Sequence, residues 1–363
     1  RFFVNRHIRP QYACRACQTV SAAPIAPALI DGGMAATGLL AWVITGKYLD
    51  HLPLYRLEQI AQRQNVPLTR ATQAEWVGRV GVGLQPLADR LAQRLRECCI
   101  LHADETPVAQ LDPGAGKTKR AYLWAYRSNA LNTGPPPIVV FDYQTSRSGR
   151  HAQHFLDGWT GYLMVDDYAG YKALFDKGIT ELGCMAHARR KFFEIQAANA
   201  SPIATEALVR IGQLYAIEAQ AKDWYIEDRA RLRAEQSAPR LKALREWLMQ
   251  TRASVAQGSA TARAIDYGLK RWEALVRYAT RGDLPIDNNP VENAIRPIAL
   301  GRKNWLFTGS ERAGKRAAAI QSLLATAKLN EMDPAAWLKD TLDKLPTWPN
   351  SRIDELLPLR ALR

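Results

Sequence analysis

The stretch "CCILHAD", residues 98–104, decides the fold, because the spacing of apolar residues changes there from a helical to a strand pattern. A short continuous apolar run of this kind is typical of a buried strand. Two more strand-like runs follow it, "AYLWAYRS" (121–128), which alternates, and "PPIVVFDYQ" (136–144), which is β-branched and apolar. The sequence therefore predicts three strands in succession from this point.

The segment between the first two strands, "LDPGAGKT" (111–118), is similar to a phosphate-binding P-loop. That pattern requires a glycine five residues before Gly116, and this chain has Leu111 there. A predicted strand, not a helix, comes after it. We therefore expect a hairpin loop with a basic tip.

Helices and strands alternate further along the chain. We expect a helix at "SRSGRHAQHFLDGW" (146–159), a strand at "GYLMVDDY" (161–168), a helix at "AGYKALFDKG" (169–178), a strand at "TELGCMAH" (180–187) and a basic helix from "ARRKFFEIQ" (188–196). This order predicts an α/β fold with a mixed sheet of five strands and helices on both faces.

The regions on either side of these elements lack strand patterns. Residues 19–33, "TVSAAPIAPALIDGG", are rich in Pro, Gly and Ala and predict a linker. Residues 34–97 are helical in pattern, and about 197–283 form a polar helical insertion ahead of a last catalytic helix. The breaks in the first region are expected at Gly46, Pro53 and Pro67. The core-like positions of the insertion are Leu214, Leu244, Trp247, Leu248, Trp272 and Leu275.

Residues 52–80 have helix-turn-helix spacing. Thr69 can cap the second helix, which carries Trp76. Many helical pairs share this spacing, so contact with DNA and a purely structural pair both stay open. The apolar face of the first helix is expected at Tyr55, Leu57, Ile60 and Ala61, and the arginines available for phosphates are Arg63, Arg70 and Arg79.

The charge balance indicates an anionic partner. Lys and Arg number 49 against 35 Asp and Glu, which gives a net charge of +14 over 363 residues. The sequence pI is about 9.7. No apolar run is long enough for a membrane span, which excludes a membrane partner and leaves nucleic acid as the leading one. A basic but otherwise ordinary enzyme is the alternative.

The five cysteines do not form a disulfide framework, since Cys98 and Cys99 are adjacent and Cys184 is isolated. Cys14 and Cys17 are a C-x-x-C pair, half of a tetrahedral zinc site. The sequence begins at Arg1, so we expect a fragment of a longer cytoplasmic chain whose second zinc-binding half lies upstream. Zn²⁺ is accordingly not expected to bind here.

Three carboxylates carry the candidate chemistry. Asp104 and Asp166 each stand at the predicted end of a strand, and Glu292 follows in a predicted helix. If that helix packs beside the two strands, the carboxylates form a set whose mutual repulsion a divalent metal relieves. Mg²⁺, or Mn²⁺ in its place, then supports in-line phosphoryl transfer.

Each carboxylate also has a structural interpretation. Asp104 suits the turn "DETP", and Asp166 suits a helix N-cap, a role for which Asp167 competes. Residues 287–297, "DNNPVENAIRP", predict an N-cap at Asn289 with Glu292 as the carboxylate of a capping box.

Five motifs carry a family resemblance. They are "HADETPV" (102–108), "VDDYAGY" (165–171), "CMAHARRKFFE" (184–194), "DNNPVENAIRPIALGRKNWLFTGS" (287–310) and "LLATAKLNEMDPAAWL" (323–338). In order and context they resemble the large transposase of the insertion sequence 66 family, over nearly the whole chain. The resemblance implies a bacterial DDE transposase, nucleoid-associated, with an RNase H-like core and Asp104, Asp166 and Glu292 as metal ligands. The family usually has Asp-Gly-Tyr where this chain has Asp166-Asp167-Tyr168.

The expected domains are a residual zinc-ribbon half (1–20), a helical region (21–97), the RNase H-like catalytic domain with its insertion (98–330), and a C-terminal helical segment (331–363). Double-stranded DNA is the expected partner, with a homo-oligomer on DNA and helper proteins of the same element.

Basic and aromatic residues near the carboxylates are candidates for DNA contact. Arg296 lies one turn after Glu292, and Arg302, Lys303 and Trp305 form a basic-aromatic patch, although Trp305 equally suits core packing. His187 and Arg190 follow the last predicted strand, where a histidine can orient water, bind phosphate or be structural. The expected activity is DNA cleavage and strand transfer. An RNase H-like nuclease and a non-catalytic DNA-binding remnant are the alternatives.

Overall fold

A five-stranded mixed sheet forms the centre of the computed structural model, which describes residues 2–129 and 135–360. The strand order is β5–β4–β3–β6–β7. In chain order the strands are β3 (Ile100–Asp112), β4 (Lys117–Ser128), β5 (Val139–Gln144), β6 (Tyr162–Val165) and β7 (Thr180–Gly183). The predicted five-stranded mixed sheet is confirmed.

The central strand β3 pairs differently on its two sides. Its start runs parallel to β6, up to the pair His102↔Met164, and β6 runs parallel to β7. From Leu101 onward β3 runs antiparallel to β4, up to Asp112↔Lys117, so the predicted hairpin loop is confirmed. The prediction that the strand ends at Asp104 is wrong, because pairing with β4 continues far beyond that residue.

The helices that follow the strands confirm the predicted alternation. They are α5 (Arg150–Phe155), the 3-10 turn η1 (Ala169–Tyr171), α6 (Lys172–Phe175) and α7 (Met185–Asn199). At the sheet edge formed by β5, α14 (Glu311–Leu329) covers the strand. The backbone N–H of Phe141 donates to Ser322 Oγ at 2.7 Å, and that of Val139 donates to Thr326 Oγ1 at 3.1 Å. The hydroxyls of α14 thus satisfy backbone groups that an open sheet edge would expose.

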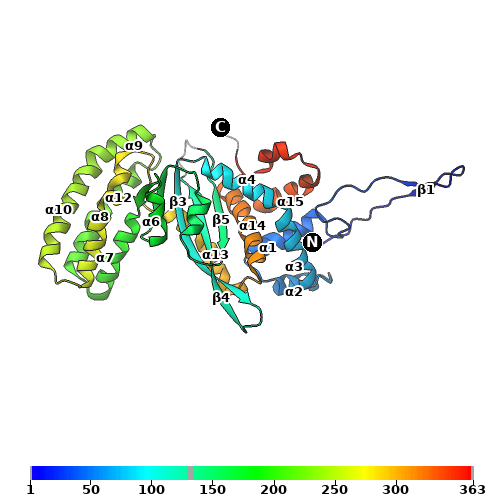
Figure 1. The fold of residues 1–363 in the computed structure, drawn as a ribbon, viewed down its shortest axis with the longest axis horizontal. Helices are drawn as coiled ribbons and strands as arrows, with labels where there is room; N and C mark the ends of the chain where they lie inside the picture. Colours follow the sequence, from blue (N-terminus) through cyan, green and yellow to red (C-terminus); the bar gives the residue numbers. More distant parts are fainter. Residues whose placement is uncertain (1, 130–134, 361–363) are drawn as a thin grey trace.

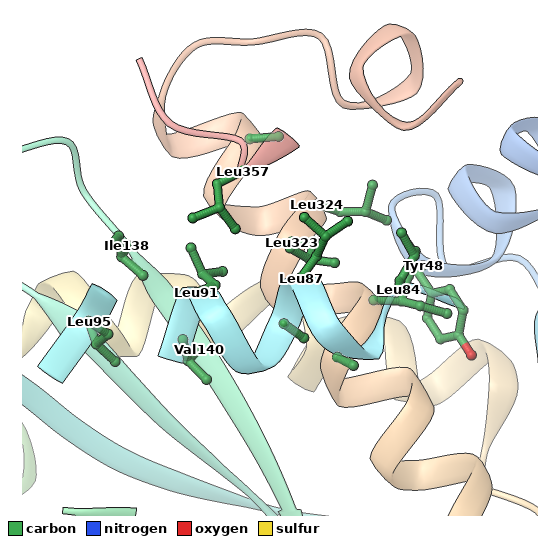
Figure 2. Packing of buried hydrophobic residues seen from close by; sticks show 14 of the residues in the cluster. Tyr48, Leu84, Leu87, Leu91, Leu95, Ile138, Val140, Leu323, Leu324 and Leu357 are labelled. Atoms are coloured by element: carbon green, nitrogen blue, oxygen red, sulfur yellow. The ribbon is translucent and has the colours of Figure 1, made fainter. Parts of the chain in front are cut away.

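The N-terminal helices pack against α14 and α15. They are α1 (Thr37–Tyr48), α2 (Leu54–Gln62), α3 (Arg70–Gly83) and α4 (Gln85–Arg96), with α15 at Pro334–Lys344. Figure 2 shows Leu87 and Leu91 of α4 beside Leu323 of α14, within one buried apolar cluster. The predicted break at Gly46 is wrong, because α1 continues through that residue to Tyr48. A Cβ at Gly46 would lie 2.8 Å from Leu57 Cδ2, so the glycine admits α2 at close range.

The pair α2 and α3 contains the predicted helix-turn-helix segment. Thr69 Oγ1 accepts the N–H of Thr72 at 3.2 Å, which confirms the predicted cap of the second helix. On the first helix Leu57 and Ala61 are buried, whereas Tyr55 is exposed. The predicted apolar face is therefore narrower than expected.

Helices occupy the region of the predicted insertion, between α7 and residue 289. Its elements are α8 (Pro202–Gln220), α9 (Ile226–Leu232), the π-turn η2 (Arg233–Ser237), α10 (Ala238–Ser254), α11 (Ala260–Lys270), α12 (Trp272–Val276) and η3 (Arg277–Thr280). Buried Arg233 pairs with Glu218 at 2.6 Å and helps hold these helices together. In Figure 1 the insertion and the N-terminal helices lie at opposite ends of the molecule, with the sheet between them.

Both chain ends lie outside the sheet. Near the N-terminus β1 (Gln11–Ala13) and β2 (Val20–Ala22) form a hairpin on a long extension (Figure 1), so part of the predicted linker is a strand. After α15 come η4 (Leu345–Thr347) and η5 (Asn350–Leu356). Arg1 and residues 361–363, which belong to the predicted terminal segments, lie outside the described residues. No described helix is both long and apolar enough to cross a membrane.

Candidate active site

Two of the predicted carboxylates flank the junction between β3 and β6. Asp166 directly follows the last residue of β6, and Asp104 lies two residues after His102, which pairs with Met164. Continuing that parallel register by two residues sets Asp104 opposite Asp166. Asp166 at the end of β6 is therefore level with Asp104 inside β3, and its charge acts on Asp104.

The third carboxylate, Glu292, comes from the first turn of α13 (Asn289–Trp305). The predicted N-cap at Asn289 is wrong by one residue: the helix begins at Asn289, and the cap position is Asn288, whose side chain makes no capping bond. Asp287 Oδ1 instead accepts the N–H of Asn289 at 3.1 Å. Glu292 is thus not part of a capping box.

Asn288 fastens the start of α13 to the sheet. Its Nδ2 donates to Ala103 O at 2.9 Å, its Oδ1 lies 3.1 Å from His102 Nδ1, and its backbone N–H donates to Cys184 Sγ at 3.2 Å. All of these groups are buried. The bonds join the helix that carries Glu292 to the strand that carries Asp104 and to the start of α7.

Asp104 is a carboxylic acid with a strongly perturbed pKa. Its pKa is raised to about 8, mainly by burial and in addition by the neighbouring charges of Glu105, Asp166 and Glu292. One opposing effect is the hydrogen bond that its Oδ1 accepts from Glu105 N at 2.8 Å. The influence of Asp166 and Glu292 on Asp104 is what close carboxylates produce, and a cation among them would relieve it.

Asp166 is not the predicted helix N-cap, because the cap position of η1 is Tyr168. The Asp166 Oδ1 accepts the N–H of Tyr168 at 2.8 Å and so begins the turn that leads into η1. Its neighbour Asp167 turns toward Arg271 on the other side, with a separation of 3.6 Å between Oδ1 and Nε. The two adjacent acids therefore have different partners: Asp166 binds a backbone N–H, and Asp167 pairs with Arg271.

Among the described residues, one group has all its ligand atoms within 4.8 Å of one another, and it is Cys184, His187 and Glu292. His187 Nδ1 lies 3.6 Å from Glu292 Oε1. Both atoms are buried without a hydrogen-bond partner among the described residues. The Cys184 sulfur already accepts the Asn288 N–H, and burial raises the pKa of its thiol to about 12. This cysteine therefore serves the fold, and the unpaired Glu292 oxygen stays available.

An open cleft of about 360 Å³ runs beside Asp166. Arg190, predicted from the sequence, lies in its wall and approaches Glu292 Oε2 at 3.4 Å. Burial lowers the pKa of His187, which also borders the cleft, so this histidine is neutral near pH 7. The cleft is lined by Arg147, Asp166, Asp167, Tyr168, His187, Arg190, Lys191, Glu194 and Tyr267.

The other predicted DNA-binding residues are spread over two regions. On α13, Arg296 and Lys303 are exposed, Arg302 donates to Pro107 O, and half-buried Trp305 packs on a buried apolar cluster. Arg70 lies at the start of α3 and pairs with Glu58 at 3.1 Å. It is far from the cleft, because α3 and α7 lie on opposite sides of the sheet (Figure 1).

Cys14 and Cys17 occupy the turn of the β1–β2 hairpin, and both are exposed free cysteines. Cys14 N donates to Thr19 O at 2.9 Å, and Gln18 N donates to Cys14 O at 2.8 Å. Hydrogen bonds from Thr19 lower the pKa of Cys17 to about 7. This turn is thus a C-x-x-C knuckle, and no metal group of the described residues includes it.

Sequence reasoning missed Glu105, Arg147 and Tyr168. Glu105 is buried beside Asp104, and Arg147 binds it from the loop between β5 and α5. The one available signal was a second acid directly after Asp104, which needs a cationic partner if it is buried. Nothing in the sequence identified that partner.

Comparison with known proteins establishes the class as transposase. Residues 32–316 match the family described as "Transposase IS66 family", and residues 322–359 match the "IS66 C-terminal element". The chain therefore belongs to the IS66 transposase family, which confirms the resemblance found in the sequence motifs.

Uncharacterized proteins of Sinorhizobium fredii are similar to the whole chain. The protein y4qI is 40% identical over 370 aligned positions, which cover 99% of this chain and 68% of y4qI. The protein y4jD is 37% identical over 370 positions, covering 98% of this chain and 72% of y4jD. The names of these relatives give no activity, and the family membership rests on the two family matches.

Proposed function

We propose that the chain is a DDE transposase that cuts DNA at the ends of an insertion sequence and joins the 3′-hydroxyls to target DNA. Asp104, Asp166 and Glu292 are its catalytic carboxylates. The observation that carries the proposal is the meeting of β3, β6 and α13: the β3–β6 register brings the two aspartates together, and Asn288 binds the Glu292 helix to β3.

The architecture is consistent with an RNase H-like core at about 98–330, interrupted by the helical insertion at about 197–283. Three strands come first, and the two strands after them run parallel to the first. We assign residues 21–97 to a helical DNA-binding region and residues 331–360 to a C-terminal helical segment. We assign residues 2–20, which contain β1 and the C-x-x-C turn, to a zinc-ribbon half-site.

The donor set fits Mg²⁺ or Mn²⁺. The three side chains offer carboxylate oxygens, the ligands that such cations prefer, and Glu292 Oε1 is buried without a hydrogen-bond partner among the described residues. Asp104, Asp166 and Glu292 would hold the ion. When bound, a divalent cation polarises phosphate oxygens and lowers the pKa of a bound water or hydroxyl.

The chain's own groups orient these acids. Arg190 and His187 border the two oxygens of Glu292, and the Tyr168 N–H fixes Asp166. Exposed Arg296 and Lys303 on α13 provide charges for the DNA backbone, and Trp305 lies at the end of that helix. A formal net charge of +14 favours DNA as the partner. A homo-oligomer on DNA and helper proteins of the same element belong to the same proposal.

The test is nicking of labelled transposon-end DNA in Mg²⁺ or Mn²⁺ by the wild type, Glu292→Gln and the control Glu246→Gln. Glu246 is exposed on α10, away from the cleft. We expect Glu292→Gln to bind DNA but to lose at least about 100-fold in nicking, the scale of one electrostatic partner of a transition state. Equal nicking by all three proteins would refute the role of Glu292.

Transfer of the cut end into a second duplex separates a transposase from an RNase H-like nuclease. Absence of any nicking alongside intact DNA binding would favour the non-catalytic remnant. Nicking without transfer, or DNA binding without nicking, would replace the proposal.

A further inference from the structure

Arg147 lies in the wall of the cleft, on the loop between β5 and α5. Its Nε donates to Glu105 Oε1 at 2.7 Å, and its Nη2 lies 2.5 Å from the same oxygen. The Glu105 side chain is 1% exposed, and its second oxygen accepts the Tyr171 hydroxyl at 2.8 Å. A buried carboxylate with every oxygen bonded thus holds one edge of the guanidinium.

Tyr168 holds the guanidinium from a second direction. The Arg147 guanidinium carbon lies 3.9 Å from the centre of the Tyr168 ring, and the Tyr168 hydroxyl donates to Arg147 O. The backbone N–H of Tyr168 donates to Asp166. Arg147 is therefore connected to the segments of both catalytic aspartates, because Glu105 follows Asp104 in β3.

The loop itself is packed closely. A Cβ at Gly149 would lie 2.2 Å from Gly170 O, a distance that no side chain can accept. The glycine lets the loop of Arg147 touch η1, which follows Tyr168. The position of Arg147 relative to Asp166 is thus determined by backbone contact as well as by side chains.

One edge of Arg147 stays open to the cleft. A guanidinium has five N–H donors. Nε and Nη2 bind Glu105, while Nη1 has no hydrogen-bond partner within residues 2–129 and 135–360, and the side chain is 46% exposed. Two further cations line the same cleft: Arg190, which is 53% exposed, and Lys191, which lies 4.4 Å from the Tyr267 ring centre. The cleft beside Asp166 thus contains three cationic side chains.

We propose that Arg147 is a phosphate-binding residue: its free edge binds a phosphodiester of the DNA strand in the cleft, with Glu105 and Tyr168 as positioning residues. The chemistry is that of an arginine, whose planar donors match phosphate oxygens. This inference rests on the proposed function and adds a subsite to it. The competing explanation is that Arg147 only neutralises buried Glu105.

The decisive variant is the double substitution Glu105→Gln with Arg147→Gln. It leaves the net charge unchanged and leaves no buried charge without a partner, so it should fold. The measurement is the affinity for labelled transposon-end duplex over a series of salt concentrations, with EDTA present to prevent cutting. We expect the slope of log K against log salt to fall by about 0.9, the value for one lost phosphate contact on duplex DNA.

Arg147→Lys and Arg245→Gln complete the set. Arg147→Lys keeps a positive charge and should keep the slope, while nicking falls about 10-fold because the planar donors are lost. Arg245 is exposed on α10 outside the cleft, and Arg245→Gln should match the wild type. Melting temperatures of all variants show whether they are folded.

A double variant that melts normally and keeps the wild-type slope overturns the inference, because Arg147 would then only neutralise Glu105. Failure of the proposed function gives a different result. In that case the wild type does not nick in any metal, while the salt slope, measured without metal, still reports on Arg147.

Discussion

Asn288 donates a hydrogen bond from Nδ2 to the carbonyl oxygen of Ala103 at 2.9 Å, directly before Asp104 in β3. This contact crosses 185 positions of sequence and joins the helix of Glu292 to the strand of Asp104. The same amide faces His102, a fully buried ring whose pKa is lowered to about 4 by burial. The geometry of the candidate site thus depends on one buried amide.

Replacing that amide should loosen the site. Asn288→Ala removes the side-chain partner of the Ala103 carbonyl and of His102 Nδ1, which costs about 1–3 kcal/mol for buried polar groups. We expect a lower free energy of unfolding, measured by chemical denaturation, and slower nicking of transposon-end DNA. The control is Asn293→Ala, an exposed position on the same helix, where the change should stay within about 0.5 kcal/mol. A stable Asn288→Ala protein would show that α13 is held in place by other contacts.

The adjacent acids Asp166 and Asp167 should respond differently to substitution. Asp166→Asn removes a proposed ligand and should abolish nicking. Asp167→Asn loses a half-exposed ion pair with Arg271, which keeps its closer partner Glu181, so nicking should stay within about 3-fold and stability within about 1 kcal/mol. Nicking by the purified variants in Mg²⁺ decides this. Loss of activity in Asp167→Asn alone would show that Asp167, and not Asp166, is the metal ligand.

Much of the sheet was predictable because its strands are short apolar runs separated by turn residues. The order of strands and helices from residue 98 to residue 199 agrees with the prediction. The end of β3 was not predictable at Asp104, because polar residues beyond it continue to pair with β4. Local pattern does not reveal how far a hairpin partner extends.

The N-cap of α13 shows a second limit of prediction from the sequence. The sequence favoured Asn289 as N-cap, but Asp287 binds its N–H, while Asn288 uses its side chain on distant partners. A local propensity was overridden by tertiary hydrogen bonds. Arg147 was missed for the same reason, since its pairing with Glu105 spans 42 positions and no local spacing encodes it.

The close approach of Gly149 to Gly170 gives a third prediction. Gly149→Ala should push the Arg147 loop away from η1 and destabilise the fold by about 1–3 kcal/mol, the usual cost of overpacking. Gly212→Ala is the matched control, because Gly212 lies in helix α8 and a Cβ there would have no neighbour within 4 Å. It should stabilise the protein by up to about 1 kcal/mol. Thermal unfolding of the two variants should therefore shift in opposite directions, and a shared direction would contradict the packing argument.

Asp354 gives a pH-dependent prediction at the C-terminal segment. This carboxylate in η5 lies 2.5 Å from Arg90 and 2.6 Å from Arg94, both on α4. The hydrogen bond from Arg90 is the main cause that lowers the pKa of Asp354 below its ordinary value of 3.8. A carboxyl group with a lowered pKa stabilises the fold above its unfolded pKa, and the contribution disappears as the pH falls through the folded pKa.

The difference in free energy of unfolding between wild type and Asp354→Asn should therefore be constant near neutral pH and shrink below about pH 4. Its size should be about 1 kcal/mol or less, because the side chain is 35% exposed and solvent screens the pairs. Urea denaturation of both proteins from neutral to acid pH measures it. Asp340→Asn, an exposed pair with Lys344, is the control and should have little effect at any pH. A difference that grows in acid would mean that Asp354 stabilises the segment in its protonated form, and that the two arginines do not hold η5 on α4.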